Sequence, residues 1–296
     1  MKILSFGSLN IDKVYSVTHF VRAGETVASQ KMEEFCGGKG LNQSVALAQA
    51  GARVFHAGAV GKEDGGMLLQ MLQSKGVDTS YVSQLPCPSG HAIIQVDPNG
   101  QNCILLYGGA NQQITREQVE RTLADFKPGD YLVLQNEING LDMLIDLAYA
   151  KGMTIVLNPS PMSEEILRLP LHKVSYFLLN EVEAADLCGE DKSPEDCLDH
   201  LVAQFPQGKF VLTLGSQGCL YRDAHLSIHQ PACPVQPVDT TAAGDTFTGF
   251  FIAGIAAGED VSTALEEATK AAAIAISRKG AAPSIPSRAE TLTYGG

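Results

Sequence analysis

The sequence of 296 residues has little that would support binding to nucleic acids or membranes. It contains 21 Lys and Arg against 33 Asp and Glu, for a net charge of −12, and no basic run. Because nucleic acids and anionic membranes are bound through concentrated Lys and Arg, neither partner is expected. No stretch approaches the ~20 apolar residues of a transmembrane helix. The first apolar stretch, "MKILSFGSLNID", is interrupted at Asp12, too early for a signal peptide.

Cysteine patterns typical of zinc sites or disulfide frameworks are also missing. The seven cysteines are scattered, odd in number and never spaced C-x-x-C, which argues against both. These absences predict a reduced, soluble, cytoplasmic protein. The hydrophobic content of 45% and charged content of 18% are values of globular proteins, so a substantial core is expected.

Short apolar runs alternate with helical patterns along the chain. The predicted buried strands are residues 2–7, 53–60, 131–135, 153–158, 175–180 and 209–215. The predicted helices between them are residues 41–51, 66–76, 115–126, 141–152 and 193–205. This alternation predicts an α/β fold: a doubly wound, mostly parallel sheet with helices on both faces.

Two segments break the alternation. Residues 13–35 and 81–107 show a period of two and no helical pattern, with "DPNG" as a turn at 97–100. We interpret them as strands of a small separate β-sheet, which would act as a lid or as a dimerising flap. The alternative is that they are antiparallel edge strands of the main sheet. The predicted organisation is a single α/β domain over residues 1–296 with two lid insertions.

A glycine-rich stretch, "CGGKGLNQS" at 36–44, leads into a predicted helix. Glycines let a backbone approach a ligand, and a helix N-terminus favours negative charge. The stretch is not a Walker A loop, because G-x-x-x-x-G-K-[ST] is absent. On its own it is equally consistent with an ordinary glycine-rich loop.

A second glycine pattern, "HAGAVGKEDGG" at 56–66, partly matches a dinucleotide-binding fingerprint. Gly58 and Gly61 fit, but His56 occupies the first position, where glycine makes the tight turn. A nicotinamide-dependent dehydrogenase is therefore disfavoured, and a packing role for these glycines is favoured.

A third pattern, "DTTAAGDTF" at 239–247, places small residues before a carboxylate at the start of an apolar helix. Unpaired N–H groups at residues 242–245 could hold a transferring phosphoryl group. Asp245 could then accept the proton of an attacking hydroxyl. The alternative is that Asp245 only complements the helix dipole, which contributes roughly 0.3–1 kcal/mol.

Polar residues follow several predicted strands, at the edge where open α/β sheets bind ligands. Each could be a turn residue, but several together favour a site; they are Asn10, Asp12, Glu137, Asn180, Glu183 and the segment 213–218.

The combined motifs resemble the ribokinase family, also called PfkB-type carbohydrate kinases. "GGKGLNQS" followed by Gly51 and Gly61 is similar to the first family signature, and "DTTAAGDTFTGFF" to the second. "NEVE" at 180–183 resembles the N-x-x-E element, and "ISRKGAAPSIP" at 276–286 the C-terminal segment. The resemblance runs from Gly7 to about Pro286.

The resemblance implies a role for each matching residue. Asp245 matches the catalytic base, and the anion hole matches the backbone N–H groups of Ala242, Ala243 and Gly244. The sugar site, beside Asp245, matches Asn10, Asp12, Gly38, Lys39, Asn42 and Glu137. The nucleotide site matches Asn180, Glu183, Thr213, Gly215, Ser216, Gly218, Gly244 and Thr269. Thr269 stands where Asn or His often contacts the adenine.

The resemblance further implies an ATP-dependent kinase that phosphorylates a primary hydroxyl, most like conversion of D-ribose to D-ribose 5-phosphate. Fructose, deoxyribose or a nucleoside is an alternative acceptor, and a non-catalytic sugar- or nucleotide-sensing protein is an alternative function. Mg²⁺ would bridge the nucleotide phosphates, with Glu183 organising the surrounding waters. The resemblance also implies a homodimer formed through the lid. A K⁺-type monovalent cation would bind at Asp239, Thr241, Ala275, Arg278, Gly280 and Ser284.

Overall fold

The computed structural model describes residues 1–189 and 192–295, so residues 190, 191 and 296 of the predicted domain lie outside the described residues. Within this part, nine strands form one large sheet in the order β13-β12-β11-β10-β9-β8-β1-β4-β5. Neighbouring strands from β11 to β5 are parallel, and β12 and β13 are antiparallel additions at one edge. The strands are β1 (Ile3–Phe6), β4 (Val54–Gly61), β5 (Asp78–Leu85), β8 (Tyr131–Gln135), β9 (Thr154–Asn158), β10 (Tyr176–Asn180), β11 (Lys209–Thr213), β12 (Cys219–Arg222) and β13 (Ser227–Gln230).

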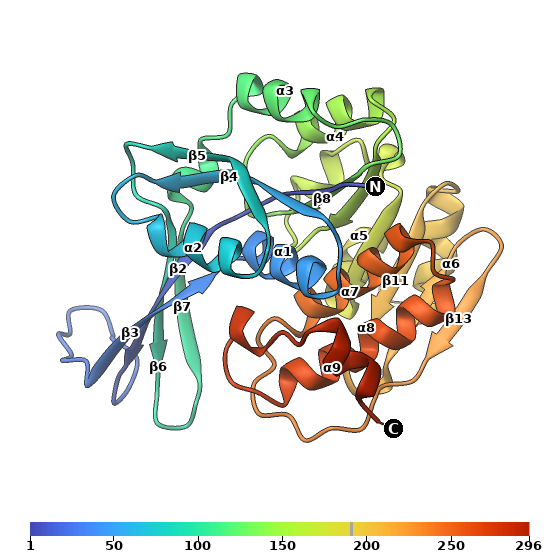
Figure 1. Cartoon of the computed structure of the whole chain (residues 1–296). Coiled ribbons are helices and arrows are strands. Elements are labelled where there is room, and N and C mark those ends of the chain that lie inside the picture. The colour runs from blue at the N-terminus through green and yellow to red at the C-terminus, as the bar shows by residue number, and fades with distance from the viewer. Residues whose placement is uncertain (190–191, 296) are drawn as a thin grey trace.

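Two helical layers cover the two faces of this sheet (Figure 1). One layer contains α3 (Arg116–Ala124), α4 (Leu141–Ala150), α5 (Glu181–Cys188) and α6 (Pro194–Gln204). The other contains α1 (Lys39–Gln49), α2 (Gly66–Ser74), α7 (Ala243–Ala257) and α8 (Val261–Ile276), with α9 (Arg288–Thr293) packed on α8. Short 3₁₀ helices lie at Gly109–Gln112, Ile166–Arg168, Leu171–Lys173, Gly215–Gln217 and Ala282–Ser284.

Successive residues of each central strand point into different cores. In β1, Leu4 packs with the α3–α6 layer, whereas Ile3 packs with the α1, α2, α7 and α8 layer. Burial on both faces requires nearly continuous apolar runs, which is how these strands are recognisable in the sequence. The predicted doubly wound α/β fold is confirmed. None of the helices in the described part of the chain is long and apolar enough to span a membrane.

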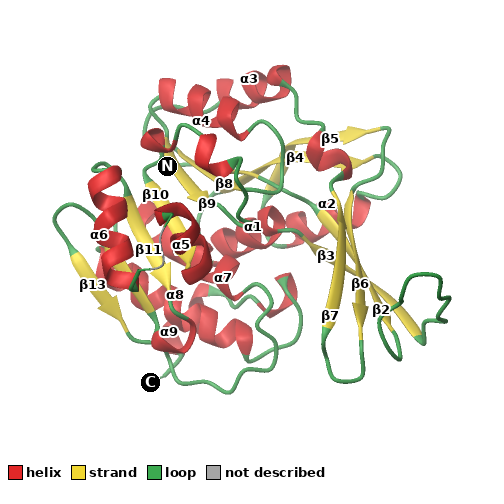
Figure 2. Ribbon diagram, turned by 180° about the vertical axis from the view of Figure 1, so that it is seen from behind, coloured by secondary structure: helices red, strands yellow, loops and turns green. Residues whose placement is uncertain are grey.

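A second, four-stranded sheet stands apart from the large one in the order β3-β2-β6-β7 (Figure 2). Its strands are β2 (Asn10–Ser16), β3 (Lys31–Gly37), β6 (Gly90–Val96) and β7 (Asn102–Tyr107). Only β2 and β6 are parallel neighbours; the other two pairs are antiparallel. The predicted separate sheet is therefore confirmed, and these four strands are not edge strands of the main sheet.

The boundaries of the two predicted lid segments differ from the structure. The first part of the 81–107 segment, up to Leu85, belongs to β5 and pairs with β4 in the large sheet. In the 13–35 segment, residues 17–30 form a connection without strands. A two-residue period thus predicted strands in both segments but did not show where each strand ends or which sheet it joins.

In the segment that partly matches a dinucleotide fingerprint, positions 56, 58 and 61 all lie within β4, and the turn comes only at residues 62–65. A Cβ atom on Gly58 would lie 2.6 Å from the carbonyl oxygen of Gly7, and one on Gly61 would lie 2.2 Å from Asp64 Oδ1. His56 is fully buried, with Nδ1 2.7 Å from Ser44 Oγ, and its burial lowers its pKa to about 4. The packing role predicted for these glycines is confirmed.

Candidate active site

The candidate site lies at the carboxyl ends of β1 and β8. Here the chain order of the sheet reverses, the place where open α/β sheets bind ligands. Ser8 follows β1 and Glu137 follows β8, and Ser8 Oγ donates a hydrogen bond to Glu137 Oε2. The same carboxylate oxygen accepts the backbone N–H of Lys39 at 2.9 Å. Glu137 therefore joins two strand ends to the start of α1.

The glycines around Lys39 allow α1 to begin against the loop after β1. Gly38 has a φ of 93°, a left-handed conformation that glycine adopts without strain. A Cβ atom on Gly40 would lie 2.4 Å from the backbone nitrogen of Ser8. The motif is thus required for close packing, and the same packing brings Lys39 and Asn42 to the site.

Asp12, on β2 of the small sheet, is partly buried and lies close enough to Glu137 to be affected by its charge. A Cβ atom on Gly37 of the neighbouring strand would lie 2.1 Å from Asp12 Oδ2, so only glycine leaves room for this carboxylate. Burial, and then the charge of Glu137, raises the pKa of Asp12 to about 6. Burial also raises the pKa of Glu137, although hydrogen bonds from Ser8 and Lys39 oppose this.

Asn10, at the start of β2, is buried and held in place by a residue far away in the sequence. Asn111 Nδ2 donates to Asn10 Oδ1 at 2.7 Å, and Asn111 Oδ1 accepts the backbone N–H of Leu9 at 3.0 Å. Because Asn111 fixes the Asn10 amide, Asn10 presents its remaining hydrogen-bonding atoms in one orientation.

Asp245 is buried in the first turn of α7 and is held by two side-chain amides of α1. Asn42 Nδ2 donates to Asp245 Oδ2 at 3.1 Å, and Gln43 Nε2 donates to Asp245 Oδ1 at 3.0 Å. Asn42 Oδ1 is also buried but has no hydrogen-bond partner among the described residues. An orphaned buried acceptor is costly unless a ligand pairs with it, so this atom suits a ligand hydroxyl.

The N-terminus of α7 presents backbone N–H groups next to this carboxylate. Its N-cap residue, Ala242, has a φ of 61° and offers no side-chain cap. This left-handed conformation costs a non-glycine residue roughly 1–2 kcal/mol, and such strain is often found at functional sites. Of the predicted anion-hole amides, Ala243 donates its N–H to Thr240 O at 3.2 Å. That donor is therefore not free as predicted, whereas the N–H of Gly244 has no partner among the described residues.

Two adjacent cavities border α7. The first, of about 290 Å³, is lined by Lys39 and Asp245 together with Asn180, Glu183 and Thr213. The second, of about 630 Å³, is mostly apolar, and its lining includes Gly215, Ser216, Gly218 and Thr269. Both cavities share Thr213, Thr240, Ala243, Gly244 and Phe247. The structure thus brings together all the residues predicted for the nucleotide, although they come from four separate parts of the chain.

Glu183 is oriented at the wall of the smaller cavity by a capping box at the start of α5. Asn180 Oδ1 accepts the N–H of Glu183 at 2.9 Å, and Glu183 Oε2 accepts the N–H of Asn180 at 3.0 Å. Asn158, at the end of β9, adds a longer hydrogen bond to Glu183 Oε2 at 3.4 Å. A local helix-start motif therefore sets the direction of this carboxylate.

Comparison with known proteins assigns the chain to a family. The pfkB family of carbohydrate kinases matches residues 1–288. The chain belongs to this family. The ribokinase of Haemophilus influenzae is 34% identical over 299 residues, which cover 97% of this chain and 96% of that protein. The deoxyribokinase of Salmonella typhi is 32% identical over 297 residues, with the same two coverages.

Solved structures show the same relationship. The ribokinase of Arabidopsis thaliana, in complex with ribose and ATP, has a TM-score of 0.86 at 27% identity. The match covers 98% of this chain and 97% of that chain. The protein is therefore a carbohydrate kinase with a ribokinase-like fold, as its motifs indicate.

In this kinase, the positions predicted for a monovalent cation lie where the loop before α7 meets the end of α8. Asp239 Oδ1 accepts hydrogen bonds from the backbone N–H and hydroxyl of Thr241, and Asp239 Oδ2 accepts the N–H of Gly280 at 2.9 Å. Burial alone would raise the pKa of Asp239, but these hydrogen bonds outweigh it, so the pKa lies below its ordinary value. Asp239 thus remains ionised and links the loop before α7 to the segment that follows α8.

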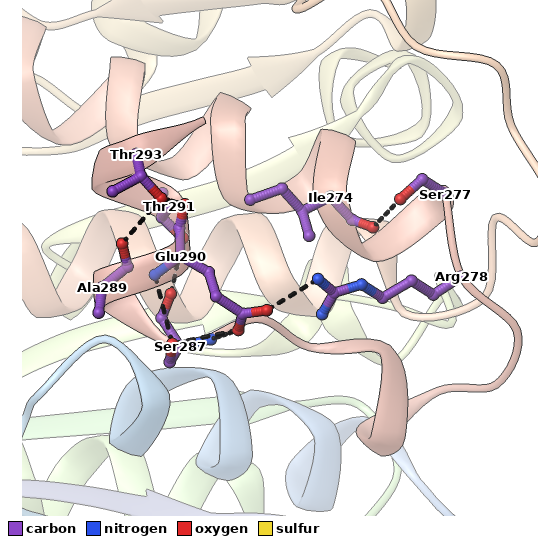
Figure 3. Close-up of polar contacts among 8 residues, drawn as sticks. All are labelled: Ile274, Ser277, Arg278, Ser287, Ala289, Glu290, Thr291 and Thr293. Atoms are coloured by element: carbon purple, nitrogen blue, oxygen red, sulfur yellow. Dashed lines mark hydrogen bonds and ion pairs between the residues drawn. The ribbon is translucent and has the colours of Figure 1, made fainter. Parts of the chain in front are cut away.

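The other predicted cation positions contribute different atoms. The Arg278 guanidinium is turned away to Glu290 of α9, at 2.8 Å, so only its backbone could face an ion (Figure 3). Ala275 O accepts the N–H of Arg278 at 3.1 Å, and Ser284 Oγ donates to Ala281 O at 2.8 Å. Within residues 1–189 and 192–295, no three His, Cys, Asp or Glu side chains gather to hold a metal ion. An ion here would depend on carbonyl oxygens and one carboxylate.

Several polar residues of the site were not predicted from the sequence: Ser8, Gln43, Asn111, Gln135 and Asn158. Three of them carried a usable signal. Gln43 adjoins Asn42 in the glycine-rich motif, and Gln135 and Asn158 each end a predicted strand. Asn111 had no such signal, because its partners Leu9 and Asn10 lie about a hundred residues away.

Proposed function

We propose that this kinase transfers the γ-phosphoryl group of ATP to the primary hydroxyl of D-ribose, giving D-ribose 5-phosphate. The main observation that supports this proposal is the position of Asp245. Its buried carboxylate is held by two side-chain amides of α1 and lies next to a free backbone N–H of α7. The ribokinase relatives support ribose as the acceptor, and the deoxyribokinase relative keeps deoxyribose as the second candidate.

In the proposed reaction, Asp245 accepts the proton of the sugar hydroxyl while the hydroxyl oxygen attacks the γ-phosphorus in line. The bond between the γ-phosphorus and the bridging oxygen breaks, and ADP leaves. The N–H groups of Ala242 and Gly244 stabilise the negative charge on the transferring group. Ala243 joins them only if its N–H is released from Thr240.

The sugar would be held by acceptors from both sheets. Asn10 and Asp12 come from the small sheet, whereas Glu137 follows β8 of the large one. Asn42 Oδ1, unpaired in the protein, would accept one hydroxyl. Carboxylates and amides suit a neutral sugar because together they accept and donate several hydrogen bonds. Gly38 and Lys39 would supply the remaining contacts to the sugar.

The nucleotide would occupy the two adjacent cavities, with its base in the larger, mostly apolar one and its phosphates beside α7. Mg²⁺ would neutralise phosphate charge. It is usually held by phosphate oxygens, waters and one or two carboxylates, and the oriented Glu183 carboxylate fits this role. Thr269 is a poor base-recognition group, because its hydroxyl donates to Leu265 O within α8 at 2.8 Å.

A monovalent cation of the K⁺ type is part of the proposal. Asp239 and the carbonyl groups near Ala275, Arg278 and Gly280 would hold it, and Thr241 and Ser284 complete the set. The ion would stiffen the turn before α7. Replacing K⁺ with tetramethylammonium at constant ionic strength should lower the kcat of the unmodified enzyme. The same replacement should leave the kcat of an Asp239→Ala variant almost unchanged. Unchanged kinetics of the unmodified enzyme would contradict the cation.

The small sheet is proposed to cover the sugar and to pair two subunits. Its outer strand β7 exposes Ile104, Leu105, Leu106 and Tyr107, each at least half exposed to solvent. An apolar strip of this kind marks an interface more often than bare surface. A cytoplasmic location is also proposed, since all seven cysteines are free.

An ADP-release assay with a panel of acceptors tests the substrate. D-ribose should show the highest kcat/KM, above 2-deoxyribose, fructose and nucleosides. If 2-deoxyribose or a nucleoside has a higher kcat/KM than D-ribose, that acceptor is the preferred substrate in place of ribose. Binding of sugar and ATP without turnover of any acceptor would instead support a sensing protein.

A further inference from the structure

Gln43 has no assigned role, yet it is one of two residues that hold the Asp245 carboxylate. The Gln43 side chain is fully buried in α1, one residue beyond Asn42. Its amide nitrogen donates to Asp245 Oδ1 at 3.0 Å and to Asn158 Oδ1 at 3.2 Å. Both amide hydrogens are therefore used, one of them on the proposed base.

The orientation of the Gln43 amide is supported by a second buried glutamine. Gln135, the last residue of β8, donates from Nε2 to Gln43 Oε1 at 2.7 Å. If the Gln43 amide were flipped, its oxygen would face the Asp245 carboxylate and its nitrogen would face the nitrogen of Gln135. Both contacts would be repulsive, so Asp245 and Gln135 together favour the orientation in which Gln43 donates to Asp245. Gln135 Oε1 is buried and has no hydrogen-bond partner among the described residues.

We propose that Gln43 is a positioning residue for the catalytic base, and that Gln135 acts on the base only through Gln43. The inference rests on the proposed role of Asp245. With Asn42 on Oδ2 and Gln43 on Oδ1, rotation of the carboxylate about its Cβ–Cγ bond is restricted. This would keep a lone pair available to the sugar hydroxyl. A general base is effective only when it is held within hydrogen-bond reach of the proton that it takes.

A neutral amide suits this position better than a charged group would. The charge of Asp245 contributes to the raised pKa of Glu137, and Lys39 lines the same cavity as Asp245. A further cation at residue 43 would pair tightly with Asp245 and weaken its basicity. Gln43 restricts the direction of the carboxylate without adding charge.

The test compares kcat and KM in variants that remove each amide. Gln43→Leu should lower kcat by about 10- to 100-fold, the effect of losing a hydrogen bond to a charged group. The KM values for sugar and ATP should change by less than about twofold, since binding is not affected. Gln135→Leu should lower kcat by only about 3- to 10-fold.

The double variant shows whether the two glutamines act in series. Gln43→Leu/Gln135→Leu should have the kcat of Gln43→Leu alone, because Gln135 has nothing left to orient. A kcat equal to the product of the two separate losses would overturn the connection through Gln135. A kcat of Gln43→Leu within about twofold of the unmodified enzyme would overturn the proposal.

Two controls separate positioning from general damage. Gln118, on α3, is also buried and donates to a backbone carbonyl, that of Gly58, at 2.7 Å; Gln118→Leu should keep its kcat. Should Gln43→Leu not fold, as judged by thermal unfolding, Gln43→Met offers an unbranched side chain for the same measurement. Asp245→Ala tests the underlying function. If this variant stays active, the proposed role of Asp245 as the base is wrong. If Asp245→Ala is inactive while the Gln43 variants are fully active, only the positioning role of Gln43 is overturned.

Discussion

The two sheets of this kinase are built differently. Every residue of β1, β4 and β8 in the large sheet is buried, whereas every residue of β7 in the small sheet is exposed. Leu105, at the centre of β7, is 68% exposed. The large sheet is therefore covered by two helical layers of the same chain, whereas the small sheet leaves apolar surface exposed to solvent.

The proposed active site combines both kinds of structure. Asp245 and Glu137 are attached to the helices and strands of the large sheet, and Asn10 and Asp12 belong to β2 of the small one. The proposed base therefore lies on the fully packed part of the molecule, whereas part of the proposed sugar site lies on a sheet with an exposed outer strand. Substitutions in the large sheet and in the small sheet should therefore affect different properties of the enzyme.

The largest effect is expected on the side of the large sheet. Asp245→Ala should lower kcat by about 10²–10⁴-fold, the usual result of losing a general base. Sugar binding, measured by calorimetry, should remain largely intact, and so should the assembly state. A kcat close to that of the unmodified enzyme would remove Asp245 from the mechanism.

A smaller effect is expected where the two sheets meet. With a pKa near 6, Asp12 is ionised at pH 7 and becomes a neutral acid as the pH falls below 6. The kcat/KM for the sugar should therefore decrease by about tenfold between pH 7 and pH 5, because the ionised, acceptor form of Asp12 is lost. Protonation of Glu137, whose pKa is also raised, adds to this decrease.

Asp12→Asn is the matched control for the pH profile. This variant should have a lower kcat/KM at pH 7 and a shallower dependence between pH 5 and pH 7. A profile as steep as that of the unmodified enzyme would assign the dependence to another group.

The smallest effect on catalysis is expected at the outer strand of the small sheet. Leu105→Lys places a charge in the exposed apolar strip and should shift the enzyme from dimer to monomer in sedimentation velocity at micromolar concentration, with little change in kcat. Leu292→Lys, at an equally exposed leucine of α9, should leave the assembly unchanged. If the unmodified enzyme is itself a monomer, the proposed dimer is wrong.

Local sequence patterns were enough to predict most of the fold. The mostly apolar runs 131–135 and 209–215 contain β8 (Tyr131–Gln135) and β11 (Lys209–Thr213), because burial on both faces favours nearly continuous apolar residues. The alternation of such runs with helical patterns specified the doubly wound arrangement. The motif at 239–247 also indicated Asp245 at the start of a helix, since small residues and a first-turn carboxylate are adjacent in the chain.

The partners of these residues were decided only by the tertiary structure. Gln43 meets Gln135 and Asp245 because α1, β8 and α7 pack together, although 92 and 202 residues separate them from Gln43. The exposure of all six β7 residues was not predictable from a two-residue period, which implies one buried face. Periodicity records which faces of an element are apolar, but the order of the strands and the packing of the layers determine which side chains meet. The sequence alone therefore determined the elements and the principal charged groups of this kinase, and the assembled sheets decided how those groups are held.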